Sequence, residues 1–194
     1  MNIGIISLNI GNVSSVKNMI KQLGHNSFIL EKPNNNAFDA VILPGVGSFD
    51  HGIKKLKETG WFSFLTNDEN ICKKNTKVLG ICLGMQMLCD GSEEGNLSGL
   101  SLIPGYFKKF DKNLINLPIP HMGWNDIVCF NQKYAIPKFE DREPRFYFVH
   151  SYYYTYNINE YVLATTNYGV NFASMINNEN IYGTQWKGII KVQY

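Results

Sequence analysis

The chain has few of the features that mark membrane, secreted or nucleic-acid-binding proteins. No segment of its 194 residues reaches the roughly 18 consecutive apolar residues that a membrane helix needs. The first residues, MNIGII, carry no basic stretch and no cleavage site, which indicates a first strand rather than a signal peptide. The net charge is only +2, with both signs intermixed, so the basic stripe typical of nucleic-acid binding is missing. We expect a cytoplasmic protein that binds neither membranes nor nucleic acids.

Cysteine is also scarce. The four cysteines, Cys72, Cys82, Cys89 and Cys129, show no CxxC spacing. In a cytoplasmic protein they are expected to be reduced thiols, and their spacing does not fit a metal site. We therefore expect no metal and no cofactor. The hydrophobic content of 44% and charged content of 18% fit one globular domain over residues 1–194.

Strand and helix patterns alternate over the first half of the chain. Short apolar runs predict strands, and between them lie helical patterns that end at Gly24 and Gly60. This alternation predicts an α/β fold with a mostly parallel central sheet flanked by helices. The predicted strands are 3–8, 27–30, 40–43 and 78–81; one helix carries Val13, Val16, Met19, Ile20 and Leu23 on one face, and the next begins near Ser48.

The second half of the chain has a different character. β-type runs follow one another, separated by turn residues, and the segment 177–180 is typical of a hairpin turn. We expect an antiparallel β region here, added to the same domain. The runs are 106–110, 126–130, 146–150, 161–166 and 180–185.

The most informative segment is KVLGICLGMQ at 77–86. An apolar run enters a glycine-flanked turn at Cys82 and continues into a helix-forming stretch. This pattern predicts a thiol at the carboxyl end of the sheet and at the start of a helix, where a thiolate is favoured and backbone N–H groups can meet an attacked carbonyl. Cys82 is thus a candidate nucleophile, although a free cysteine can also be an inert core residue. Cys89, further along the expected helix, is interpreted as core.

This segment resembles the nucleophile elbow of class I, triad-type glutamine amidotransferases, and PGVGSF at 44–49 resembles their oxyanion loop. Further segments are similar, in the same order, to the glutaminase subunits of imidazole glycerol phosphate synthase: GNVSSV at 11–16, SEEG at 92–95, PHMGWN at 120–125 and YFVHSYY at 147–153. The resemblance covers nearly the whole chain. It implies a single class I glutamine amidotransferase domain that hydrolyses glutamine and passes the ammonia to a cyclase subunit, a (β/α)8 barrel, in histidine biosynthesis.

The resemblance also implies roles for individual residues. Cys82 would attack the side-chain amide of glutamine, and backbone N–H groups of Leu83 and Val46 would stabilise the oxyanion. The residues that match glutamine-binding positions are Gly45, Gly47, Gln86, Glu94, Ser151 and Tyr152. Those that match positions facing the cyclase in a heterodimer are Asn12, His121, Met122 and Trp124. His150 could be a base by residue type alone, whereas its motif favours a structural or interface role.

The pattern breaks at the catalytic base. In the family, a Gly-x-Gln-Phe-His-Pro-Glu segment supplies the histidine that takes the thiol proton and the glutamate that orients it. Here GTQ at 183–185 is followed by Trp186, and Lys187 and Ile189 replace the histidine and the glutamate. We expect weak binding and very poor hydrolysis of glutamine, and a chain altered or truncated after Gln185 by a frame change.

Three other functions stay open. A related subunit could supply ammonia for amination of a surface sugar. A non-catalytic subunit could dock on a synthase and regulate it. A general cysteine hydrolase with a similar elbow is disfavoured by the segments at 120–125 and 147–153.

Overall fold

A computed structural model of the protein describes residues 1–34, 36–67, 76–129, 145–155 and 159–187. Five parallel strands form one half of its main sheet, in the order β2, β1, β3, β4 and β13. The predicted α/β class with a mostly parallel central sheet is confirmed. The bounds are Asn2–Ile6 for β1, Asn26–Leu30 for β2, Ala40–Gly45 for β3, Lys77–Cys82 for β4 and Ile181–Thr184 for β13.

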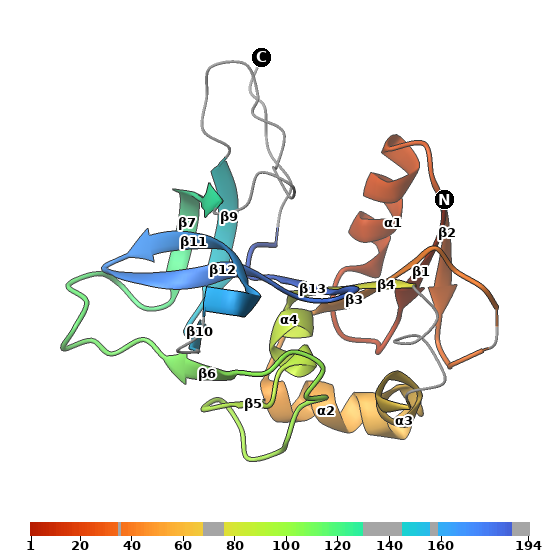
Figure 1. The fold of residues 1–194 in the computed structure, drawn as a ribbon, viewed down its shortest axis with the longest axis horizontal. Coiled ribbons are helices and arrows are strands. Elements are labelled where there is room, and N and C mark those ends of the chain that lie inside the picture. Colours follow the sequence, from red (N-terminus) through yellow and green to blue (C-terminus); the bar gives the residue numbers. More distant parts are fainter. Residues whose placement is uncertain (35, 68–75, 130–144, 156–158, 188–194) are drawn as a thin grey trace.

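Helices cover both faces of the parallel strands (Figure 1). Helix α1 (Val13–Gln22) lies on one face, and α2 (Phe49–Glu58), α3 (Trp61–Thr66) and α4 (Leu83–Leu88) lie on the other. The side chains of a strand alternate between the two faces. Ile3, Ile5 and Ile42 accordingly pack with Ile20 of α1. The alternate side chains on the same strands, such as Ile6 and Leu43, point to the other face and join the larger core with α2, α3 and α4.

The C-terminal half adds antiparallel strands to the same sheet. Beyond β13 follow the antiparallel strands β12 (Val170–Asn178), β10 (Tyr152–Thr155) and β6 (Tyr106–Lys109). At the edge, the short β5 (Gly91–Ser92) from the first half of the chain pairs parallel with β6. β11 (Val162–Tyr168) pairs with β12 and with β8 (Val128–Cys129). A separate two-stranded sheet joins β7 (His121–Asp126) to β9 (Arg145–His150), and a 3-10 turn spans Asn159–Tyr161. The predicted antiparallel region is therefore confirmed.

Some predicted boundaries were wrong. The run 126–130 is not one strand, because Asp126 ends β7 and β8 begins at Val128; residue 130 lies outside the described residues. β5, β7, β10, β12 and α3 were not predicted. The hairpin turn is confirmed between β12 and β13, where Asn178 pairs with Ile181 and Glu179 has a φ of 52°.

The helix α1 departs from its predicted apolar face at one residue. Leu23 was expected on the buried face, but its side chain is 64% exposed. The reason is that the helix ends at Gln22 and Leu23 is already its C-cap, followed by Gly24 with a φ of 77°.

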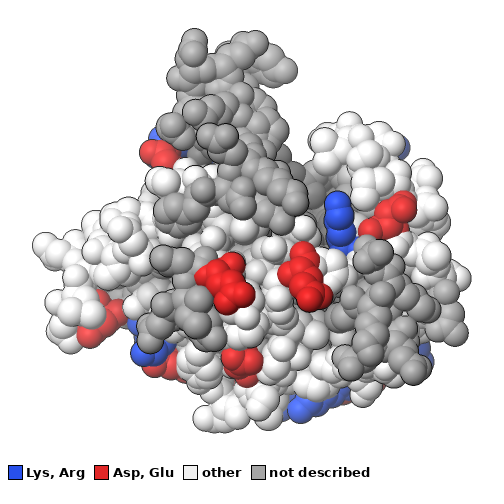
Figure 2. All heavy atoms as spheres, in the orientation of Figure 1, with Lys and Arg blue, Asp and Glu red and all other residues white. Residues whose placement is uncertain are grey.

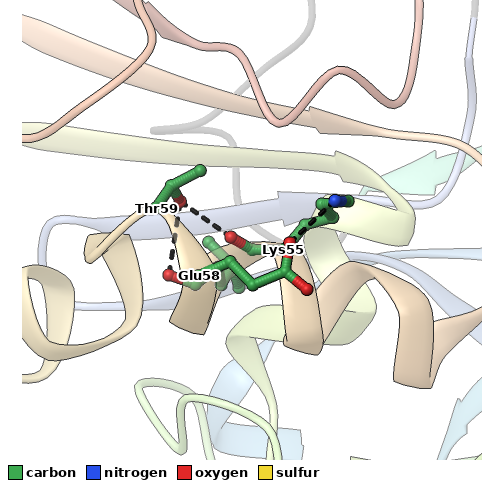
Figure 3. Close-up of polar contacts among 4 residues, drawn as sticks. Lys55, Glu58 and Thr59 are labelled. Carbon is green, nitrogen blue, oxygen red and sulfur yellow. Dashed lines mark hydrogen bonds and ion pairs between the residues drawn. The ribbon is translucent and has the colours of Figure 1, made fainter.

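Helix α2 ends in a small set of polar contacts (Figure 3). The Nζ of Lys55 lies 2.7 Å from a carboxylate oxygen of Glu58. The hydroxyl of Thr59 donates to the carbonyl oxygens of Lys55 and Leu56 at the helix end, and the backbone N–H of Thr59 also donates to the carbonyl oxygen of Lys55.

Charged side chains are spread thinly over the surface. On the face drawn in Figure 2, acidic and basic residues are scattered among mostly uncharged ones. Within the ranges that the structure describes, no helix has the length and apolarity required to traverse a bilayer.

Candidate active site

Cys82 lies at the carboxyl end of β4, on a sharp turn into α4. Its φ is 56°, a left-handed conformation that is uncommon for a residue with a side chain. Gly84 permits the turn, since a Cβ at this position would overlap the carbonyl oxygen of Leu43 on β3. The predicted strand–turn–helix geometry is therefore present, with the strain expected at a nucleophile elbow.

A cavity of about 250 Å³ opens beside this turn. It brings together segments that are far apart in the sequence, and most of the predicted substrate-binding residues lie in its wall. The lining residues are Val46, Gly47, Cys82, Leu83, Gln86, Glu94, Pro120, Val149, His150, Ser151, Tyr152 and Lys187.

Gly45 does not line the cavity. It pairs with Cys82 across β3 and β4, and a Cβ there would lie 3.0 Å from the Cβ of Leu83. The missing side chain allows β3 to approach the elbow closely. The structure therefore places Gly45 in the backbone support of the site, whereas Gly47, with a φ of 106°, is in its wall.

The thiol of Cys82 is shielded from solvent. The residue is only 5% exposed, and this burial raises the pKa of its thiol above the ordinary value. The positive charge of Lys187 and the N–H of Leu83 act in the opposite direction but do not outweigh burial. The expectation that the turn favours a thiolate was wrong, because burial removes the sulfur from water and disfavours its charged form.

Gln185 is a neighbour of the sulfur that the sequence analysis did not assign to the site. Its side-chain Nε2 donates to the Sγ of Cys82 at 3.9 Å, and its buried Oε1 has no hydrogen-bond partner among the described residues. The sequence offered one signal for this role, because Gln185 ends the GTQ segment that resembles the family's segment before its catalytic histidine.

Glu94 and Gln86 are held by one hydrogen-bond network. The Oε2 of Glu94 accepts from the backbone N–H of Phe49 at 3.2 Å. The hydroxyl of Ser92 donates to the Oε1 of Gln86 at 3.3 Å and accepts from the backbone N–H of Glu94. Burial is the main influence on Glu94 and raises the pKa of its carboxyl. Ser92 was not predicted as a site residue, although it opens the SEEG segment.

Two histidines meet at the cavity wall, where His150 lines the cavity and His121 does not. His121 and His150 pair across β7 and β9, and the Nδ1 of His121 lies 3.0 Å from the Nε2 of His150. The Nδ1 of His150 lies 2.8 Å from the carbonyl oxygen of Tyr152. A carbonyl only accepts, so Nδ1 of His150 carries the proton, its Nε2 accepts, and Nδ1 of His121 donates. The tautomer of both rings is therefore fixed.

The residues expected to face a partner lie in different environments. Asn12 is exposed and caps α1, with its Oδ1 accepting from the N–H of Ser15. Met122 and Trp124 share the outer face of β7 and are 60% and 39% exposed. His121 points the other way and is 1% exposed, so the expectation that its side chain faces a partner is corrected.

The cavity contains a thiol but, among the described residues, no imidazole that is free to take its proton. His150 is the only imidazole in its wall. Burial lowers the pKa of His150 to about 3, and its Nε2 already accepts from His121. Lys187 stands in the wall where a base is expected, and Ile189 lies outside the described residues. The arrangement places a thiol at a cavity, but it supplies no free imidazole to deprotonate that thiol among the described residues.

A strained cysteine elbow on a parallel sheet, facing a glycine-rich loop, defines a class of amide-cleaving proteins. The family model "Glutamine amidotransferase class-I" matches residues 8–186, and the chain belongs to this family. It is 43% identical over 185 residues to "Imidazole glycerol phosphate synthase subunit HisH 2" of Methanococcus maripaludis, covering 95% of this chain and 90% of that protein. The corresponding HisH subunit of Leptospira borgpetersenii is 40% identical over 187 residues, with the same coverage.

Solved structures agree on the fold. A crystal structure titled as a glutamine amidotransferase superposes with a TM-score of 0.72 at 14% identity, covering 95% of this chain and 89% of that one. A glutamine amidotransferase of Thermotoga maritima gives a TM-score of 0.63 at 18% identity, covering 96% of this chain and 75% of that one. At these identities the likeness establishes the fold alone.

Proposed function

We propose that this chain is the glutaminase subunit of an imidazole glycerol phosphate synthase in the cytoplasm, where its ammonia passes to a cyclase barrel. The observation that carries the proposal is the single cavity that joins Cys82, the Val46 loop and Glu94. The names of relatives at 40% and 43% identity support the pathway.

In the proposed reaction, the Sγ of Cys82 attacks the side-chain carbonyl carbon of glutamine. The N–H groups of Leu83 and Val46 donate to the oxyanion of the tetrahedral intermediate. Ammonia leaves after taking up a proton, and water then hydrolyses the thioester to glutamate and regenerates the thiol. Both proton transfers need a base near the sulfur, and Lys187 is a poor one while it is charged. We propose that this chain performs the reaction very slowly.

A second candidate function follows from the lack of a base near the sulfur. A subunit that binds glutamine without turning it over could dock on the synthase and regulate it. The replacement of the histidine by Lys187 favours this function. A glutaminase assay of the chain with its cyclase separates the two: measurable release of ammonia that Cys82→Ala abolishes supports the enzyme, and a stable complex without release supports the regulatory subunit.

The outer face of β7 is the proposed docking surface for the cyclase. Met122 and Trp124 are exposed there, and aromatic residues of this kind often dominate binding energy at interfaces. We expect Trp124→Ala to weaken the complex by about tenfold. Titration of the cyclase with each variant measures this. Leu23→Ala is the matched control, since Leu23 is 64% exposed but lies at the far end of α1 from Asn12. Equal weakening by both variants would contradict the proposed surface.

A further inference from the structure

The cavity contains one basic and one acidic side chain. Lys187 and Glu94 both line it, but no ion pair joins either of them to another residue in the described ranges. The backbone N–H of Lys187 donates to the carbonyl oxygen of Tyr147 at 3.0 Å and holds this residue at the edge of β9. The carboxylate of Glu94 is fixed by the N–H of Phe49. The backbone of Lys187 and the carboxylate of Glu94 are therefore held at the cavity, and neither side chain has an ion-pair partner among the described residues.

The two charges act on the sulfur in opposite directions. Lys187 lowers the pKa of the Cys82 thiol and Glu94 raises it. Among the described residues that line the cavity with this sulfur, Lys187 is the one lysine or arginine, so it supplies the positive charge of the site. In the family, the sulfur of this cysteine attacks the side-chain amide of glutamine, so the ligand's side chain lies at this end of the cavity. The positive charge of Lys187 favours a ligand whose side chain is negatively charged.

We propose that this cavity binds L-glutamate, whose side chain ends in a carboxylate, in preference to L-glutamine. Lys187 and the N–H of Leu83 would hold the side-chain carboxylate, and Glu94 would hold the α-ammonium group. The inference rests on the proposed function for the orientation of the ligand. The inference goes beyond that function because it assigns to Lys187 a change in ligand selectivity, from a neutral amide to an anion.

Bound glutamate stays intact in such a site. A thiol that attacked its side-chain carboxylate would have to expel oxide or hydroxide, a far poorer leaving group than ammonia, so no thioester forms. The cavity of about 250 Å³ has room for one small amino acid. The chain therefore acts as a reversible receptor for an acidic amino acid.

Equilibrium binding by calorimetry tests this, using the full chain with L-glutamate and L-glutamine at low salt. We expect glutamate to bind about tenfold more tightly, and the ratio to shrink at high ionic strength because Lys187 is exposed. Lys187→Gln removes the positive charge and should abolish the preference. Lys77→Gln is the matched control, since Lys77 is an exposed lysine at the opposite end of β4 from Cys82 and should leave the preference intact.

The possible outcomes are distinct. Equal affinities, tighter binding of glutamine, or a preference for glutamate that persists in Lys187→Gln would each overturn the inference and leave the proposed function standing. Failure of the folded chain to bind either amino acid would overturn both. Thermal unfolding of each variant verifies that the protein is folded. Lys187→Met, a second neutral replacement, must lose the preference as Lys187→Gln does.

Discussion

Replacing Lys187 by histidine is expected to raise the glutaminase turnover of this chain by about 10²-fold or more, the range typical of a positioned general base. Position 187 is in the wall of the cavity that contains Cys82, so an imidazole there would share that cavity with the thiol. Burial raises the pKa of this thiol, which makes a partner that accepts its proton especially valuable. Ammonia release, measured with the cyclase present, is the appropriate assay.

Three further variants make the test specific. Cys82→Ala combined with Lys187→His should lose the gain, because the new base has no thiol to act on. Lys77→His, at the other end of β4, should leave turnover unchanged. Adding Ile189→Glu to Lys187→His should raise turnover again, since a carboxylate orients the imidazole in this kind of triad. High turnover in the unaltered chain would contradict the assignment of Lys187 as the defect.

The parallel half of the fold could be predicted because several of its strands, such as β1 and β3, are largely buried. Runs such as 40–43 and 78–81 are continuous and apolar, which is the local signature of strands in a parallel sheet. The strand β12 was missed because Asn171, Ser174 and Asn177 interrupt its apolar residues, and Ser174 is nevertheless fully buried. Its pairing with β11, β10 and β13 outweighs the local sequence, and no local pattern reports such long-range contacts.

The candidate site was predicted unevenly for a similar reason. The elbow at Cys82 could be located because its glycines and its neighbouring run form a local pattern. The burial of the sulfur could not, since it depends on how distant segments such as the one at Gln185 close around it. The contact between His121 and His150 also depends on the register of β7 against β9, which the sequence does not reveal.

The buried pair of histidines is expected to make the fold acid-labile. Burial lowers the pKa of His121 to about 4 and that of His150 to about 3, from an ordinary value of 6.5. The nearby charge of Lys187 also lowers the pKa of His150. The hydrogen bond from His150 to the carbonyl oxygen of Tyr152 raises that pKa. Both rings are neutral in the folded protein at pH 7. His121 stacks on Phe148, and His150 meets Phe172 edge-on.

The sign of the effect follows from proton linkage. Below pH 6.5 the unfolded chain takes up a proton at each of these histidines, while the folded protein does not until the pH falls to about 4 or 3. Acid therefore stabilises the unfolded state. At pH 5 the loss is about 2 kcal/mol for each ring and about 4 kcal/mol for the pair. A loss of that size is a large part of the stability of a typical domain.

Urea denaturation at pH 7 and at pH 5 measures this loss. His150→Gln removes one of the two buried imidazoles, so its free energy of unfolding should fall by about 2 kcal/mol less between the two pH values than that of the unaltered chain. His51→Gln is the control, because His51 is exposed on α2 and should not alter the fall. The same fall in the His150 variant as in the unaltered chain would mean that His150 is protonated in the folded state. The assignment of neutral rings, with His121 donating to His150 and His150 donating to the carbonyl oxygen of Tyr152, would then be wrong.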